Sequence, residues 1–483
     1  MEKNTHSRSA IGERRSRSTH CVGRVTVMAL LITVAVSTSL PDVTPARAEL
    51  QSPYRSASFS AGTRPSAVRV GDLDGNGLND IAVVNLQGSL QLFFNNGAGS
   101  FERVSLNGLW PQGFNTLDLD IGDLNGDGRN DIAVAFATQS GAVSVLLNRG
   151  SRTFAAPVNY DSCNSSRGVA IGDLDRDGDS DLVDISQCSK AGILLNNGQG
   201  VFAFSGAYGN GSASKSIVLA DFNRDGFKDI AYINNTVGGT ITVMLNNRNG
   251  TFGAPALHYA GDLPDDMAAG DFDGDGNTDV AIANSYYSQV IVLFNSNNGD
   301  FPGYSEVYGG DTPTSIAVAD LNGDGRTDLA VTSSGTGRLS VLLNRGDYSF
   351  DAPISYNVGQ SPVDVAAGNL DGDSLPDLVA ANQGSDSITV LFSAGGASAP
   401  PPSPQVSLTV SKRTTKKATL IDLRWSGAAS ASVDIYRNGS RIATVSNTGA
   451  YTDQFSRSTA GTFTYQVCPG GDQACSNEAA ISF

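Results

Sequence analysis

Short apolar runs follow one another along most of the chain, and polar segments rich in Gly, Asn and Asp separate them. Two examples, Ile81–Val84 and Ile132–Ala135, contain only β-branched and small residues. Short runs of this composition between turn-forming residues predict β-strands rather than helices. Four such runs fit into each stretch of about 49 residues. The pattern therefore predicts repeated four-stranded sheets and an all-β fold.

A nine-residue polar pattern interrupts these runs seven times, beginning at Asp72, Asp123, Asp173, Asp221, Asp271, Asp320 and Asn369. Positions 1, 3, 5 and 9 carry Asp or Asn in every copy, and position 6 is Gly in six of the seven. Copies at a nearly constant period of 48 to 51 residues indicate structural repeats of the size of a propeller blade.

Acids at fixed alternate positions indicate calcium, which takes six to eight hard oxygen ligands from a tight loop. Ordinary polar turns would not need this spacing, and an EF-hand would need flanking helices and a Glu at position 12. We expect up to seven Ca²⁺ ions with a mainly structural role. The candidate ligands are Asp72, Asp74, Asn76 and Asp80; Asp123, Asn125, Asp127 and Asp131; Asp173, Asp175, Asp177 and Asp181; Asp221, Asn223, Asp225 and Asp229; Asp271, Asp273, Asp275 and Asp279; Asp320, Asn322, Asp324 and Asp328; and Asn369, Asp371, Asp373 and Asp377. The last loop departs from the pattern at Asn369 and Ser374, so we expect its site to be the weakest.

These loops resemble the FG-GAP or VCBS repeats of secreted bacterial proteins and of the integrin α-subunit propeller. The resemblance covers residues 51 to about 393. It implies a seven-bladed β-propeller whose calcium loops join the first and second strands of each blade. It implies no single activity, because this fold serves adhesion, glycan binding and some polysaccharide lyases.

The last repeat runs into a Pro-rich segment without a fourth strand, whereas Ser52–Ser60 reads like the fourth strands of the other repeats. We therefore expect the N-terminal strand to complete the seventh blade, which would also hide two sheet edges. On this interpretation the propeller occupies residues 49–394.

Residues 1–48 have the pattern of a cleaved export signal. Basic residues precede the apolar run Val25–Leu40, and Ala46-Arg47-Ala48 matches a signal-peptidase site. The alternative is a membrane anchor, but a span needs roughly 20 apolar residues. We expect a mature chain that begins at Glu49 and is secreted or held at the cell surface, with the Sec and Tat routes both open.

Two further segments follow the propeller region. Residues 395–405 are rich in Pro and predict an extended linker. Residues 406–483 contain alternating apolar and polar runs, and the order of Trp425, Tyr436 and Tyr465 resembles that of a fibronectin type III domain. This module is expected to be an immunoglobulin-like β-sandwich.

Cysteine usage fits an oxidising compartment, because four Cys remain after the export signal. We expect disulfides between Cys163 and Cys188 and between Cys468 and Cys475; free thiols are the alternative for the first pair. The formal net charge of −16 argues against nucleic acid as a partner, since its phosphates would be repelled.

Function is expected on the face opposite the calcium loops, because variable loops on a rigid scaffold are common binding sites. The candidate ligand-binding residues there are Trp110, Phe114, Tyr286 and Tyr287, for which packing between blades is the alternative role. We expect a monomeric module that binds extracellular glycans or surface proteins. The alternatives are a polysaccharide lyase or hydrolase with His258 as base, although no partner residues for it can be identified, and a structural matrix component.

Overall fold

A computed structural model describes residues 54–97, 99–110, 115–137, 142–162, 165–186, 190–211, 213–393, 407–415, 418–426, 432–438, 440–456, 461–469 and 479–482. The expected export signal and linker lie outside these residues, as do Phe114, Cys163, Cys188, Cys475 and the side chain of Cys468. The described residues form strands and one 3₁₀ turn, Gln383–Ser385, and the expected all-β fold is confirmed. No described helix is long and apolar enough to span a membrane.

Described residues 54–393 form seven four-stranded antiparallel sheets, numbered here along the chain. Sheet 1 contains β2 (Pro65–Gly71), β3 (Asp80–Asn85), β4 (Ser89–Asn95) and β5 (Phe101–Leu106); sheet 2 contains β6 (Asn115–Gly122), β7 (Asp131–Ala137), β8 (Ala142–Leu146) and β11 (Val158–Asp161); sheet 3 contains β12 (Ser166–Gly172), β13 (Asp181–Ser186), β14 (Ala191–Asn196) and β15 (Phe202–Tyr208). Sheet 4 contains β16 (Ser214–Ala220), β17 (Asp229–Asn234), β18 (Thr240–Met244) and β19 (Ala256–Tyr259); sheet 5 contains β20 (Pro264–Gly270), β21 (Asp279–Asn284), β22 (Gln289–Phe294) and β23 (Gly303–Tyr308). Sheet 6 contains β24 (Pro313–Ala319), β25 (Asp328–Ser333), β26 (Arg338–Leu342) and β27 (Ile354–Asn357); sheet 7 contains β28 (Pro362–Gly368), β29 (Asp377–Asn382), β30 (Ser387–Phe392) and β1 (Arg55–Ser60). A short hairpin of β9 (Asn148–Gly150) and β10 (Thr153–Phe154) precedes β11.

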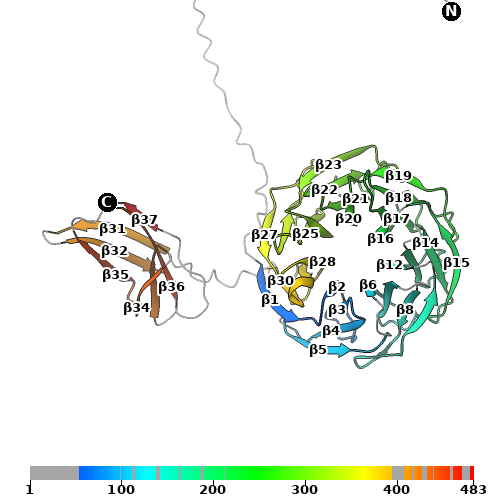
Figure 1. Ribbon diagram of the computed structural model, residues 1–483, viewed down its shortest axis with the longest axis horizontal. Helices are drawn as coiled ribbons and strands as arrows, with labels where there is room; N and C mark the ends of the chain where they lie inside the picture. Colours follow the sequence, from blue (N-terminus) through cyan, green and yellow to red (C-terminus); the bar gives the residue numbers. More distant parts are fainter. Residues whose placement is uncertain are drawn as a thin grey trace, which may run out of the picture. The chain divides into compact units, whose positions relative to one another are not determined.

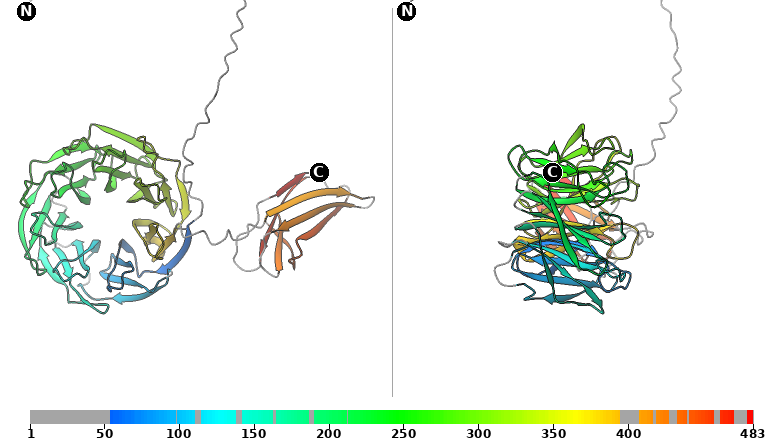
Figure 2. Two further views of the ribbon diagram at one scale, coloured as in Figure 1. Left: turned by 180° about the vertical axis from the view of Figure 1, so that it is seen from behind. Right: turned by 90° about the vertical axis from the view of Figure 1, so that its right-hand side faces the viewer.

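The sheets lie around a ring, with the first strand of each sheet innermost (Figures 1 and 2). Neighbouring first strands contact one another in order, and β2 contacts both β6 and β28, so the ring is closed. In sheet 7, β1 pairs with β30 from Arg55 opposite Phe392 to Ser60 opposite Ser387. The two ends of the ring segment therefore share one sheet.

The core lies between adjacent sheets. The second strands β3, β13, β17, β21, β25 and β29 are buried along their whole length. Outer strands such as β23 alternate between partly buried and exposed positions. Because each sheet is covered on both faces, its middle strands need apolar residues at every position, whereas an outer strand needs them only at alternate positions.

Described residues 407–482 form two further sheets. One contains β31 (Ser407–Thr414), β32 (Ala418–Ser426) and β35 (Ala450–Ser456); the other contains β34 (Ser440–Ser446), β33 (Ser432–Arg437), β36 (Thr462–Pro469) and β37 (Ala479–Ser482). Both sheets contribute to one core, in which Trp425 and Tyr465 are 6% and 1% exposed. The Tyr465 hydroxyl donates a hydrogen bond to Asp453, which also pairs with Arg437 at 2.7 Å.

Candidate metal centres

The seven nine-residue loops connect the first and second strands of the seven sheets. In sheet 1, β2 ends at Gly71 and Asp80, at position 9 of the loop, begins β3. Neighbouring loops contact each other: Asn130 of the second loop donates to the carbonyl of Asp72 at 2.9 Å, and Asn79 of the first donates to the carbonyl of Asn369 at 3.1 Å. The loops therefore gather on one face of the ring, which we call the loop face.

In three loops, carboxylates of the same nine-residue segment lie close together. The sets are Asp72, Asp74 and Asp80; Asp173, Asp175 and Asp181; and Asp271, Asp273 and Asp279, and within each set one ligand atom per residue lies within 4.8 Å of the others. These are the three loops that have Asp at both position 1 and position 3. Each of the other four has Asn at one of these two positions.

The side chain at position 1 accepts hydrogen bonds from the backbone of its own loop, which folds around it. In the first loop, the two carboxylate oxygens of Asp72 accept hydrogen bonds from the backbone N–H groups of Gly75, at 2.7 Å, and Gly77, at 2.9 Å. The six Gly residues at position 6 have φ between 79° and 94°, a region that disfavours residues with a Cβ. This backbone requirement explains the recurrent Gly that the sequence shows.

The seventh loop is built differently. Asn369 replaces the position-1 Asp, and its amide nitrogen donates to the carbonyl of Asp373, a role that a carboxylate cannot take. Ser374 at position 6 does not adopt a positive φ. This loop consequently offers one oxygen fewer at position 1.

The Asp at position 9 closes each loop onto the sheet. Asp279 accepts the N–H of Phe272 at 2.9 Å and the N–H of Asn295, which follows the third strand, at 2.8 Å. The same two bonds occur in all seven sheets, and the seven carboxyls are at most 1% exposed. Position 9 therefore has a structural role in addition to any contact with a metal.

Burial raises the pKa of these position-9 carboxyls, and the two backbone hydrogen bonds only partly oppose this shift. The pKa rises to about 6 for Asp80, Asp131, Asp229 and Asp377 and to about 7 for Asp181, Asp279 and Asp328. Nearby loop carboxylates raise it further. A divalent cation would remove this penalty by favouring the ionised form.

In six of the seven sheets, an Asn at or just after the end of the third strand links the loop to the preceding sheet. Asn148 Nδ2 donates to the carbonyl of Asn130 in its own loop, at 2.9 Å, and to the carbonyl of Leu73 in the loop of sheet 1, at 2.7 Å. Five other Asn residues make the same two bonds: Asn95, Asn196, Asn246, Asn295 and Asn344. In sheet 7 the corresponding residue is Ser393, which forms its hydrogen bonds within its own sheet. The sequence shows the recurrent Asn but not its partner in the preceding repeat.

A family comparison agrees with this repeated unit. The FG-GAP-like repeat family matches residues 72–134, 123–183, 221–282, 271–331 and 320–380, and each match begins at position 1 of a loop. Together the matches cover more than half of the chain. The chain belongs to the FG-GAP-like repeat family. The resemblance inferred from the loops is confirmed to this extent.

Several solved structures are similar to this FG-GAP-like repeat protein. BBS1N in complex with ARL6DN matches at 14% identity and a TM-score of 0.48, over 72% of this chain and 98% of that chain. The extracellular domain of a hybrid two component system from B. thetaiotaomicron matches at 11% identity and 0.47, over 89% of this chain and 58% of its own. Saccharomyces cerevisiae Sqt1 matches at 10% identity and a TM-score of 0.47, over 78% of this chain and 97% of that chain. No curated protein matches the chain.

The donor set of the FG-GAP-like loops fits a hard cation. Positions 1, 3 and 5 offer carboxylate or amide oxygens. These are hard ligands, which suit calcium better than they suit softer metals. In the described loops, some outer oxygens pair with Arg: Arg152 contacts Asp74 at 2.8 Å and Arg248 contacts Asp225 at 3.1 Å. These pairs compensate part of the negative charge on the loop face.

The centre of the ring is a polar channel of about 570 Å³, lined by the first strands. First strands are sheet edges, and side chains from the neighbouring sheet satisfy their free N–H groups. Asp364 accepts the N–H of Val68 at 2.8 Å, and Asp266 accepts the N–H of Ile316 at 3.0 Å. The polar residues of the channel therefore hold adjacent sheets together.

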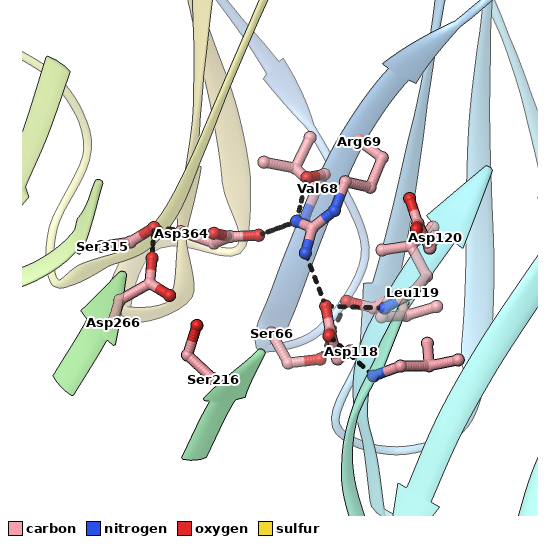
Figure 3. A network of polar contacts seen from close by, with 12 residues as sticks. Ser66, Val68, Arg69, Asp118, Leu119, Asp120, Ser216, Asp266, Ser315 and Asp364 are labelled. Atoms are coloured by element: carbon pink, nitrogen blue, oxygen red, sulfur yellow. Dashed lines mark hydrogen bonds and ion pairs between the residues drawn. The ribbon is translucent and has the colours of Figure 1, made fainter. Parts of the chain in front are cut away.

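Arg69 lies between two of the carboxylates that line this channel (Figure 3). Its guanidinium lies 2.8 Å from Asp118 and 2.9 Å from Asp364. Burial raises the pKa of Asp118 to about 7, although the Arg69 charge opposes the shift. Arg69 thus compensates charges that belong to sheets 2 and 7 on either side of its own sheet.

The expected ligand-binding aromatics differ in their burial. Trp110 is only 5% exposed, packs in the core between sheets 1 and 2 and donates from its indole nitrogen to Ser144 at 2.9 Å, so its geometry favours the alternative packing role over ligand binding. A Trp in a polar loop has no periodicity that would reveal its burial. Tyr286 and Tyr287 are 63% and 48% exposed on the turn between β21 and β22.

His258 lies in β19, with its ring edge-on to Phe301 at 5.1 Å between centroids. Burial lowers its pKa, although Asp300 opposes this shift from 3.9 Å. Its side chain is only 14% exposed. Within the described residues, this geometry favours a packing role over that of a base in an open site.

Proposed function

We propose that this protein is a secreted, seven-bladed β-propeller stabilised by calcium, which acts as an extracellular binding module for glycans. The seven four-stranded sheets in a closed ring support the blade number. The two-sheet core of residues 407–482 supports a fibronectin type III-like module at the C-terminal end. The pattern of residues 1–48 supports export.

Calcium has a structural role in this proposal. Each loop concentrates several carboxylates on one face of the ring, and their mutual repulsion needs compensation. Bound ions would draw positions 1, 3, 5 and 9 together and stiffen the connection between the first two strands of a blade. We propose that the seventh loop binds most weakly, because Asn369 supplies fewer oxygens than Asp.

The observation that carries the binding role is the exposed tyrosine pair on the rigid ring. Tyr286 and Tyr287 lie edge to face, 4.9 Å apart, and the Tyr287 hydroxyl donates to Asp262 at 2.7 Å. A tyrosine held by a carboxylate presents a preorganised apolar face to solvent, which suits the C–H face of a sugar ring. Two disulfides, Cys163–Cys188 and Cys468–Cys475, complete the proposal for an oxidising environment.

The test is a polysaccharide array probed with the mature chain from Glu49 in millimolar calcium, with absorbance followed for unsaturated products. Binding without product formation supports the proposal, and product formation would replace it with the lyase hypothesis. A double variant, Tyr286→Ala with Tyr287→Ala, should weaken binding. Val237→Ala is a matched control, because Val237 is 81% exposed in the corresponding turn of sheet 4.

A further inference from the structure

A groove of about 540 Å³ lies on the loop face where sheets 5 and 6 meet. Its lining includes the loop carboxylates Asp273 and Asp275. It also includes Tyr304 of β23 and Tyr348, which follows β26. The two tyrosines are 60% and 58% exposed, so their rings are available to a ligand.

Tyr348 occupies a position that other sheets reserve for Gly. Four residues after the linking Asn, the chain has Gly99, Gly200, Gly250 and Gly299 in four sheets, all with positive φ. Tyr348 adopts the same left-handed conformation, with φ 64°, although a Cβ is disfavoured there.

Close packing explains the Gly at the other seams. A Cβ on Gly200 would lie 2.9 Å from Leu147, and one on Gly299 would lie 3.0 Å from Leu245, both in the preceding sheet. At the seam of sheets 5 and 6 the corresponding residue is Phe294, and the Tyr348 ring packs edge-on against it at 5.0 Å. The large side chain therefore builds an aromatic wall over a seam that Gly leaves flat.

The remaining exception, Arg152 at the seam of sheets 1 and 2, does not build such a wall. Its guanidinium lies over the Phe94 ring at 4.8 Å and pairs with Asp74 and Glu102. The Arg152 charge is therefore compensated by two carboxylates of the protein itself. Among the described sheets, only the seam of sheets 5 and 6 combines an aromatic residue at this position with a groove beside a loop.

We propose that this groove binds a pyranose ring of an extracellular glycan, an inference that rests on the proposed glycan-binding function. The groove is amphiphilic in the same way as a sugar. Tyr304 and Tyr348 offer apolar faces for the C–H groups, and Ser296, beside the loop carboxylates, offers a polar edge to the hydroxyl groups. Because two residues of the fifth loop line the groove, the site requires that loop to be ordered.

The seam of sheets 3 and 4 is a natural counterpart without the second aromatic. The third loop has Asp at positions 1, 3, 5 and 9, as the fifth loop has. Phe204 pairs with Leu194 as Tyr304 pairs with Leu293, each two residues before the linking Asn. Gly250 stands where Tyr348 stands in sheet 6. Binding at the sheet 5–6 seam and not here would therefore depend on Tyr348.

The experiment compares Tyr348→Gly, Tyr304→Ala and the control Phe204→Ala in the mature chain, titrated with each polysaccharide that binds the wild type on the array. We expect the two tyrosine variants to lose affinity by about tenfold or more, as for a central aromatic contact, and the control to bind like the wild type. Tyr348→Gly introduces the residue of four other sheets, so its thermal midpoint should stay close to that of the wild type.

The outcomes separate the site from the function. If Tyr348→Gly and Tyr304→Ala bind with unchanged affinity while the Tyr286 and Tyr287 double variant loses binding, the groove proposal is overturned and the glycan-binding function stands. If the wild type binds no polysaccharide, both fall. Chelation of calcium should abolish binding in the groove before the ring unfolds, which circular dichroism of the same samples would show.

Discussion

At the scale of single residues, the loop positions divide into two kinds. Asp279 at position 9 is buried and accepts two backbone N–H groups, whereas Asp273 at position 3 accepts one local N–H, from Asp275 at 3.0 Å. Both belong to the same set of potential ligands. Substitution should therefore affect folding and metal binding to different degrees at the two positions.

Asp279→Asn should lower the free energy of unfolding by about 1–3 kcal/mol with or without calcium, because one buried N–H would face the amide nitrogen instead of an oxygen. Asp273→Asn should change the metal-free stability by less than about 0.5 kcal/mol, since its local acceptor remains. It should, however, reduce the stabilisation that calcium gives. Urea titrations in calcium and in EDTA measure both; equal effects of the two variants in EDTA would contradict this division.

Arg69 tests whether the channel carboxylates need compensation. Arg69→Met should destabilise the ring by about 1–3 kcal/mol, because Asp118 and Asp364 would lose the positive charge that compensates their burial. Arg345→Met is the control, since its pair with Asp351 is about half exposed on the Arg side and should contribute less than about 1 kcal/mol. Thermal unfolding compares the two; a smaller effect at Arg69 would refute the role.

Residue-level chemistry was only partly visible in the sequence. The recurrent acids and Gly of the loops could be identified, because their spacing repeats. Arg69 and Tyr348 each occur in one copy, so no repeat singles them out. The signal for Tyr348 was its departure from Gly within an otherwise regular turn, and the loop-face location of its groove became visible only when the seams were placed in space.

At the scale of elements, β1 closes the ring, because it comes from the N-terminal end and pairs with β30 of sheet 7. It covers the edge of β30, and the segment before β2 buries Tyr54 and Ala61 against the neighbouring sheets. The Phe59 ring packs against Phe93 and Phe101 of sheet 1. This segment therefore joins sheet 7 to sheet 1 as well as completing sheet 7.

Deleting residues 49–62 should destabilise the whole ring by at least about 3 kcal/mol, because the buried Tyr54 and the partly buried Phe59 are lost and β30 becomes an open edge. A chain that lacks only residues 49–53 keeps the strand and serves as the control. Calorimetry should show a lower midpoint for the longer deletion alone. An unchanged midpoint would mean that the pairing of β1 with β30 contributes little to stability.

The elements themselves followed from the pattern because a strand buried on both faces has a simple signature, a short apolar run between turns. The sequence comparison between Ser52–Ser60 and the other fourth strands pointed to the role of β1. The links between sheets did not follow, since Asn148 and its partner Leu73 are 75 residues apart and lie in different repeats. Local periodicity carries no information about such contacts.

At the scale of the whole molecule, the loops couple stability to both calcium and pH. The protein carries a formal net charge of −16, and much of its acid is concentrated in the loops. The raised pKa of the position-9 carboxyls means that the metal-free folded protein holds protons that the unfolded chain, with a pKa of about 3.9, releases at neutral pH. Ionising these groups in the folded state therefore destabilises it.

The direction of the pH dependence follows from this difference in bound protons between the folded and unfolded states. Without calcium, the folded state binds more protons than the unfolded state between about pH 4 and 7, so stability should rise as the pH is lowered from 8 to 6, through the pKa values of about 7 for Asp181, Asp279 and Asp328. Calcium should stabilise most at pH 8 and less at pH 6, because protons compete for the same oxygens. Thermal midpoints in calcium and in EDTA across this range measure both slopes. If metal-free stability instead falls from pH 8 to 6, the folded state favours the ionised form of the buried carboxyls. Calcium would then not act by relieving charge repulsion in the loops.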